Sequence, residues 1–157
     1  MSDLYELYAD GSSTGKVGEG GWAFVVLKNK VVIKEDSNGA LSTTNNKMEL
    51  MGVIEGLEYL YTNNLSLASI TVFSDSQYVV KGITEWYAGW EVKIARGKTI
   101  LNQEYWLRFK QLSENFPHVK YQWINGHSGI EYNERCDVLA KAAKKKITEE
   151  SLNESNN

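Results

Sequence analysis

Four acidic residues lie where a carboxylate could take part in chemistry: Asp10, Glu49, Asp75 and Asp137. Asp10 ends a segment that alternates apolar and polar residues, and Asp75 ends the β-branched run at 70–74, so each follows a predicted strand. Aspartate is depleted in strands, and its ordinary role at such a position is a turn or a helix cap. A functional carboxylate is the alternative, and each residue taken alone leaves both interpretations open.

Glu49 lies in the first turn of a predicted helix, where its charge would interact favourably with the helix dipole. Gly52 and Gly56 follow on the same helical face, although a glycine inside a helix costs about 1 kcal/mol relative to alanine. Close approach of that face to a sheet would explain both glycines and would bring Glu49 towards the strand ends. Asp137 lies in the last predicted helix, where a solvent-exposed position is the plain alternative.

A group of carboxylates needs a cation, because like charges held close together repel one another. Ligand sets made only of oxygen favour Mg²⁺ or Mn²⁺ over zinc. Two such ions, ~3.5–4 Å apart, can activate a water and stabilise the leaving oxygen of a phosphoryl displacement. The sequence supplies the acids, but their spacing alone does not bring them together.

The segments that must position these acids follow the order β-β-β-α-β-α-α-β-α, which predicts an α/β (mixed α+β) fold with helices on the faces of one mixed sheet. Asn45 or Asn46 is expected to cap the first helix. Loops are predicted at 11–13 and 18–21. The predicted strands are 4–10, 22–27, 31–35, 69–74 and 119–124, and the predicted helices are 46–62, 76–90 (in pieces broken near Gly82 and Gly89), 102–114 and 131–146.

The 157 residues are enough for about one domain, and their 42% hydrophobic content is enough to form a core. The sequence contains no apolar run approaching ~20 residues and no secretory signal, so no membrane association is expected. The single cysteine, Cys136, excludes an internal disulfide and a cysteine-built zinc site, and it fits a reduced, cytoplasmic setting.

The net charge of −3 argues mildly against a nucleic-acid partner, since phosphate binding requires positive charge. However, residues 148–157 carry three glutamates and no Lys or Arg, so residues 1–147 are neutral overall, and basic side chains are in excess at 86–110. We expect one domain at 1–147 and a disordered acidic tail at 148–157. The Lys144–Lys146 run is interpreted as the solvated end of the last helix, favourable to its dipole.

Five segments resemble type 1 ribonuclease H and occur in the order typical of that family. They are Tyr8–Ser12, Thr43–Leu50, Ser74–Val79, Gly126–Gly129 and Asn133–Asp137. Any one segment would be modest evidence, whereas five in order over residues 4–143 are highly specific. The resemblance implies a ribonuclease H-like fold, in which a five-stranded mixed sheet, its first three strands antiparallel, is flanked by helices.

The resemblance also implies which residues act. Asp10, Glu49, Asp75 and Asp137 match the metal-binding catalytic acids, which hold two Mg²⁺ ions, or Mn²⁺ as a substitute, when substrate is bound. His127 matches a loop histidine that assists catalysis or product release. The residues that match substrate-contacting positions are Gly11 and Ser12 in the first segment, Asn45 and Gln77 near the 2′-hydroxyls, Thr44 and Asn102 at a DNA phosphate, and Trp86 and Trp90 along the DNA strand.

The implied function is an endonuclease that hydrolyses the RNA strand of RNA–DNA hybrids and leaves 5′-phosphate and 3′-hydroxyl ends. The protein is expected to act as a monomer. A non-catalytic binding module on the same fold is one alternative, but such a module would be expected to lose one of the acids. Another nuclease of the wider superfamily, such as an integrase or a junction resolvase, is a second alternative, against which Asn45 and Gln77 favour ribonuclease H.

Overall fold

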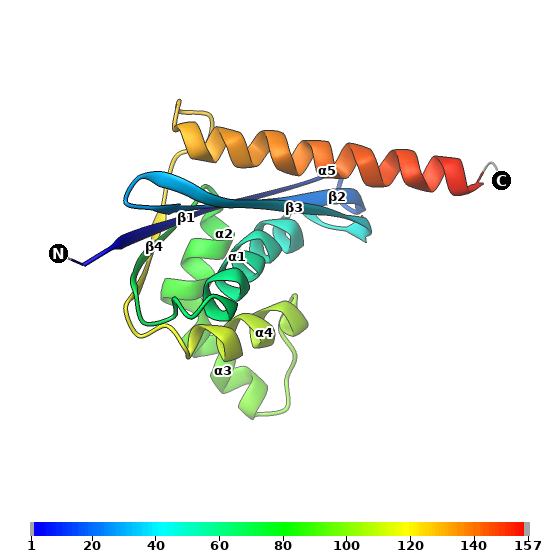
Figure 1. Cartoon of the computed structure of the whole chain (residues 1–157). Helices are drawn as coiled ribbons and strands as arrows, with labels where there is room; N and C mark the ends of the chain where they lie inside the picture. Colours follow the sequence, from blue (N-terminus) through cyan, green and yellow to red (C-terminus); the bar gives the residue numbers. More distant parts are fainter. Residues whose placement is uncertain (1, 156–157) are drawn as a thin grey trace.

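Residues 2–155 are described in the computed structural model, and their strands form a mixed sheet with the order β3-β2-β1-β4-β5 (Figure 1). The first three strands pair antiparallel, whereas β4 runs parallel to both β1 and β5. The expected five-stranded mixed sheet is therefore confirmed. The strands are β1 (Leu4–Ser13), β2 (Gly18–Lys28), β3 (Val31–Thr43), β4 (Ser69–Ser74) and β5 (Val119–Trp123).

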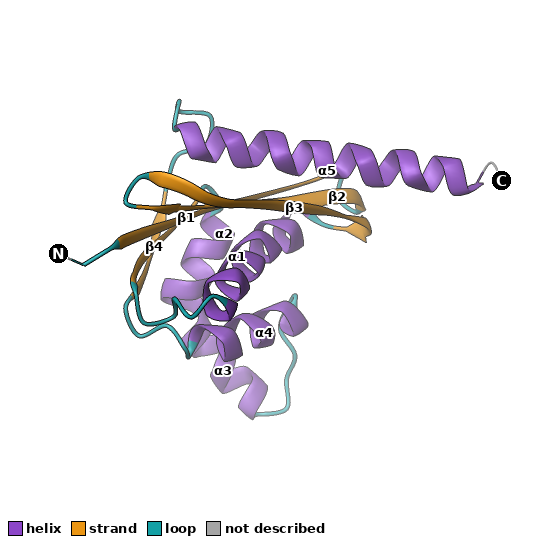
Figure 2. Cartoon of the chain, viewed as in Figure 1, coloured by secondary structure: helices purple, strands orange, loops and turns teal. Residues whose placement is uncertain are grey.

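Helices cover both faces of the sheet (Figure 2). The long helix α5 lies across one face, and the remaining helices lie together on the other. Within residues 2–155, no helix is both long enough and apolar enough to cross a membrane. The helices are α1 (Asn45–Thr62), α2 (Gln77–Lys81), the π-helical turn η1 (Gly82–Trp86), α3 (Tyr87–Ala95), α4 (Gln103–Ser113) and α5 (Glu131–Ser155).

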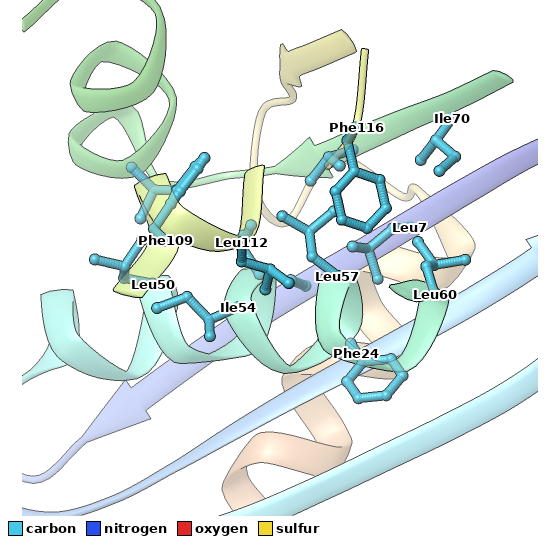
Figure 3. Packing of buried hydrophobic residues seen from close by; sticks show 14 of the residues in the cluster. Leu7, Phe24, Leu50, Ile54, Leu57, Leu60, Ile70, Phe109, Leu112 and Phe116 are labelled. Atoms are coloured by element: carbon cyan, nitrogen blue, oxygen red, sulfur yellow. The ribbon is translucent and has the colours of Figure 1, made fainter. Parts of the chain in front are cut away.

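The main core fills the space between α1 and the sheet (Figure 3). Leu50, Ile54 and Leu57 recur at helical spacing as an apolar stripe along α1 and are completely buried. Burial of a leucine or isoleucine side chain contributes about 1.5–3 kcal/mol, so this stripe fixes α1 against the sheet. A smaller cluster, which includes Val25 and Cys136, forms under α5 on the opposite face. The two clusters hold β1 and β2 between α1 on one face and α5 on the other.

The expected loops at 11–13 and 18–21 are wrong, because both segments are strand. Ser12 pairs with Gly21 across the β1–β2 ladder. Glycines there indicate close packing rather than a turn. A Cβ on Gly20 would lie 2.5 Å from Thr43 Cγ2, and one on Gly21 would lie 2.2 Å from the carbonyl oxygen of Ala140.

The helix starting near residue 76 is continuous, although breaks were expected at its glycines. Gly82 begins a π-helical turn, and the helix then continues through Gly89 to Ala95. A Cβ on Gly82 would lie 2.4 Å from the Trp106 ring, so this glycine allows helix packing and does not end the helix. The cap of α1 also differs from expectation, since the Thr44 hydroxyl, not Asn45 or Asn46, accepts the N–H of Lys47 at 3.2 Å.

The disordered tail expected from residue 148 is not what the structure shows, because α5 continues to Ser155. Extending an existing helix needs no new nucleus, and Lys145 and Lys146 stand four residues before Glu149 and Glu150, a favourable spacing of opposite charges. Residues 156–157 of the expected tail lie outside the described residues.

Deleting residues 148–157 is expected to leave the domain folded, because most side chains beyond Ile147 are exposed. The loss should be below about 1 kcal/mol, which corresponds to at most about 4 °C in the melting temperature of a chain of this size. Thermal melting of the truncated and full chains measures it. A fall of more than about 10 °C would show that the last turns of α5 contribute to the fold.

Candidate active site

Two of the predicted acids are brought together by the register of parallel strands. Ala9 of β1 lies opposite Ser74 of β4 in the last pair of that ladder, so Asp10 and Asp75 follow side by side. Side chains at the same edge of neighbouring parallel strands are close in space. The strand-end interpretation is confirmed for Asp75, which follows β4, but it is wrong for Asp10, because β1 continues to Ser13 in its pairing with β2.

Glu49 reaches the same edge because glycines allow α1 to approach β1 closely. A Cβ on Gly11 would lie 2.2 Å from the carbonyl carbon of Met48, so no other residue fits there without movement. A Cβ on Gly52 would lie 3.0 Å from the carbonyl oxygen of Asp10, and one on Gly56 would lie 2.4 Å from a Leu7 methyl group. The close approach inferred from the two helix glycines is confirmed.

One carboxylate oxygen from each of Asp10, Glu49 and Asp75 lies within 4.8 Å of the others. Asp10 and Glu49 are buried, and none of the three joins an ion pair within residues 2–155. Asp10 Oδ1 accepts the N–H of Gly11 at 2.9 Å, but the buried Glu49 Oε2 has no hydrogen-bond partner in the described structure. A buried carboxylate oxygen without a partner carries a large desolvation penalty. The three carboxylates have no positively charged partner within residues 2–155 that would offset this penalty.

The pKa values of the two buried acids, Asp10 and Glu49, reflect this lack of a positively charged partner. Burial, together with the negative charge of Asp75, raises the pKa of Asp10 from 3.8 to about 7, despite the opposing Gly11 N–H. Burial raises the pKa of Glu49 well above its ordinary value, and the Asp10 charge adds to the effect. A divalent cation would remove the repulsion, and a cluster made only of oxygen ligands fits Mg²⁺ or Mn²⁺.

The fourth predicted acid, Asp137, is not part of this close group. Its Oδ2 lies 3.0 Å from Lys141 Nζ, one turn further along α5. Asp137 is still near enough for its charge to make a small contribution to the raised pKa of Asp10. The structure thus gathers three of the four acids and leaves the fourth beside them, neutralised by a lysine.

His127 lies in the exposed loop between β5 and α5, with a positive φ of 57°. The base of this loop is fixed against Asp75. A Cβ on Gly126 would lie 2.8 Å from Asp75 Oδ2, and Trp123 Nε1 donates to the Asp75 carbonyl at 3.0 Å. The histidine therefore stands next to the acids, on a segment whose tip is open to solvent.

The candidate substrate contacts surround this edge in separate groups. Asn45 and Gln77 are exposed in the first turns of α1 and α2. Asn102 has a left-handed backbone, and its Nδ2 donates to the Tyr78 hydroxyl at 3.0 Å. The Trp86 and Trp90 rings lie 6.0 Å apart, with Trp86 41% exposed. No hydrogen bond within the described residues joins Thr44 to Asn102.

Trp90 is partly a core residue. Its ring lies 5.0 Å from that of the fully buried Trp106. Trp86 is the more exposed of the pair and carries the larger free ring surface. Of the two tryptophans that match positions along the DNA strand, Trp86 therefore offers the larger surface for that contact.

Two residues of the site were not found from the sequence. Asn133, which is 3% exposed, donates from Nδ2 to Asp75 Oδ2 at 3.2 Å and so orients that carboxylate. The Tyr78 hydroxyl accepts from both Asn102 and Trp106 Nε1, at 3.0 and 2.8 Å. The signal available for Asn133 was its place in the family-like segment Asn133–Asp137, but nothing in the sequence names its partner.

Comparison with known proteins identifies relatives along nearly the whole chain. The family model described as RNase H matches residues 2–145. A ribonuclease H from a Cyanothece species is 40% identical over 144 residues, covering 90% of this chain and 89% of the relative. A ribonuclease HI from Pasteurella multocida is 42% identical over 145 residues, covering 90% of both chains.

Solved structures show the same fold. LC9-RNase H1, described as a type 1 RNase H with the type 2 active-site motif, superposes with a TM-score of 0.80 at 27% identity, covering 93% of this chain and 74% of that one. LC11-RNase H1, solved in complex with an RNA/DNA hybrid, gives a TM-score of 0.74 at 24% identity, covering 92% and 99%. Because LC11-RNase H1 is only 24% identical to this chain, its similarity supports the fold alone.

Proposed function

The chain belongs to the ribonuclease H family of hydrolases, and we propose that it cuts the RNA strand of RNA–DNA hybrids as an endonuclease. The observation that carries the proposal is the group of three carboxylates within 4.8 Å at the strand ends, without a cationic partner in residues 2–155. The relatives named ribonuclease H and ribonuclease HI, which are 40% and 42% identical to this chain, support the choice of substrate. The proposed products carry 5′-phosphate and 3′-hydroxyl ends.

Asp10, Glu49 and Asp75 would hold divalent metal, with Asp137 joining them once it is released from Lys141. Mg²⁺ is the proposed ion, with Mn²⁺ as a substitute and two ions per site when substrate is bound. When bound, such ions activate a water and stabilise the leaving oxygen. The protein's own contribution is to fix the carboxylates, by means of Gly11 and Asn133, and to bury them in a site of low dielectric.

His127 is proposed to assist proton transfer or product release from its loop beside Asp75. The remaining substrate contacts are proposed as the resemblance assigns them. Asn45 and Gln77 lie near the 2′-hydroxyls, Thr44 and Asn102 bind a DNA phosphate, and Trp86 and Trp90 lie along the DNA strand. Gly11 and Ser12 are proposed as further substrate contacts. The exposure of Asn45 and Gln77 supports reading of a 2′-hydroxyl, which distinguishes RNA from DNA. We further propose that the enzyme is a cytoplasmic monomer, to which its buried, unpaired Cys136 is suited.

A gel assay on end-labelled duplexes tests the function. The full chain is incubated with an RNA–DNA hybrid, duplex DNA and duplex RNA of one sequence, each with Mg²⁺ and with chelator. We expect cleavage of the RNA in the hybrid alone, and only with Mg²⁺. Extension of the products by a polymerase identifies 3′-hydroxyl ends.

The two alternatives give different results in the same assay. A non-catalytic module would bind the hybrid and cut nothing, and an integrase or resolvase would cut DNA. Equal cleavage of duplex DNA would refute the substrate assignment.

A further inference from the structure

The Lys144–Lys146 run does not lie at a helix end. Helix α5 continues to Ser155, more than two turns beyond Lys146, so the run is too far from the C-terminus to stabilise the helix dipole. Lys145 and Lys146 are exposed, whereas Lys144 is half-buried. A half-buried lysine in the middle of a helix needs a different explanation.

Lys144 is held against the strand that carries Asp10. Gly21 of β2 leaves room for α5, since a Cβ there would lie 2.8 Å from the backbone nitrogen of Lys144. Gly21 pairs in register with Ser12 of β1. The Lys144 ammonium donates to Ser12 Oγ at 3.4 Å, across 132 positions of the sequence.

The charge of Lys144 is unmatched. Within residues 2–155, no carboxylate lies within ion-pair distance of its Nζ, and its partner is a neutral hydroxyl. Lys141, one turn earlier, has its charge matched by Asp137 at 3.0 Å. An ammonium that is held on β1 by a neutral hydroxyl and has no carboxylate partner is suited to an anion supplied from outside.

We propose that Lys144 binds a backbone phosphate of the strand that is cut. The inference rests on the proposed function and adds a contact to it. Ser12 stands two residues beyond Asp10 in an extended strand, a distance of about 7 Å. One strand of a duplex carries a phosphate about every 3.4 Å along the axis, so the bound phosphate would lie within about two nucleotides of the scissile bond.

The test compares Lys144→Met with Lys145→Met, which removes the same charge from the next, exposed position of α5. Hybrid binding is measured in chelator over a series of salt concentrations, and cleavage kinetics are measured in Mg²⁺. We expect Lys144→Met to weaken binding about three- to tenfold at low salt and to reduce the slope of log Kd against log salt by about one. KM should rise while kcat stays within about twofold, and Lys144→Arg should restore binding.

Lys145→Met should change Kd less than about twofold, with an unchanged slope. If Lys144→Met matches Lys145→Met in Kd and slope while the wild type cuts hybrid, the phosphate contact is refuted and the proposed function stands. If the wild type neither binds nor cuts hybrid, both are refuted. A lower melting temperature of Lys144→Met with an unchanged salt slope would assign Lys144 a structural role and overturn the proposal.

Discussion

Replacement of Asp10 by asparagine is expected to lower hybrid cleavage by at least about a thousandfold while the domain stays folded. Asparagine keeps the shape of aspartate and still offers an oxygen to the Gly11 N–H, but it removes one of the three charges gathered within 4.8 Å. Metal-assisted stabilisation of phosphoryl transfer supplies several kcal/mol, and each 1.36 kcal/mol is a factor of about ten in rate. The loss should fall on kcat, with hybrid affinity in chelator retained.

Asp36→Asn is the matched control. Asp36 Oδ1 also accepts the N–H of the following residue, Ser37, at 2.8 Å, but Asp36 is exposed on the edge strand β3. This variant should keep full activity, because it removes the same charge and the same kind of local contact far from the acids. Asp10→Asn with turnover close to wild type would show that the carboxylate cluster is not the catalytic centre.

The sequence could predict the site because five segments in order resemble ribonuclease H, and the surroundings of three of the acids gave physical support. A strand that ends in aspartate has a limited set of explanations, and the glycines at 52 and 56 were costly unless α1 touched the sheet. The structure confirms that contact through the Cβ positions of both glycines. Parallel pairing of β1 with β4 then follows from the fold, and it places Asp10 beside Asp75.

What the sequence could not provide were pairings made by tertiary contact. Asp137 and Lys141 share a helix at the i, i+4 spacing, but whether the lysine or the cluster holds the carboxylate depends on where α5 lies. Asn133 acquires its role only because α5 crosses the sheet beside Asp75. Similarly, the glycines at 18–21 indicate a loop until a helix is known to pack on them, since local propensity cannot anticipate a close neighbour.

Neutralising Asp10 is also expected to stabilise the metal-free protein above pH 7. The folded-state pKa of Asp10 is raised to about 7 from 3.8, by burial and by the charge of Asp75. The folded state therefore binds a proton that the unfolded state has already released between about pH 4 and pH 7. Since the unfolded state binds fewer protons there, the free energy of unfolding falls as pH rises through this window, and it levels off above it.

The size of the gain follows from that shift. A displacement of about three pKa units corresponds to about 4 kcal/mol at ~1.4 kcal/mol per unit, an upper bound because the acids titrate together and solvent screens part of their repulsion. Asp10→Asn should therefore add about 1–3 kcal/mol at pH 8, or about 3–10 °C in melting temperature. Removing the Asp10 charge also relieves Glu49, because that charge helps to raise the pKa of Glu49.

Thermal melting in chelator at pH 4 and pH 8 measures the effect, with Asp36→Asn as control. The gain should be present at pH 8 and nearly absent at pH 4, where Asp10 of the wild type is protonated in the folded state and only about half ionised in the unfolded state. Added Mg²⁺ should stabilise the wild type by about 2.7 kcal/mol at a hundred times its Kd, and Asp10→Asn much less, because a ligand is missing. An equal gain in melting temperature at both pH values would mean that the asparagine stabilises the protein by better packing and not by removing a repelling charge. The contradicting result is that Asp10→Asn melts below wild type in chelator at pH 8 and that Mg²⁺ shifts the melting temperature of neither protein. The carboxylates would then neither repel one another nor bind metal, because both effects require that their negative charges lie close together.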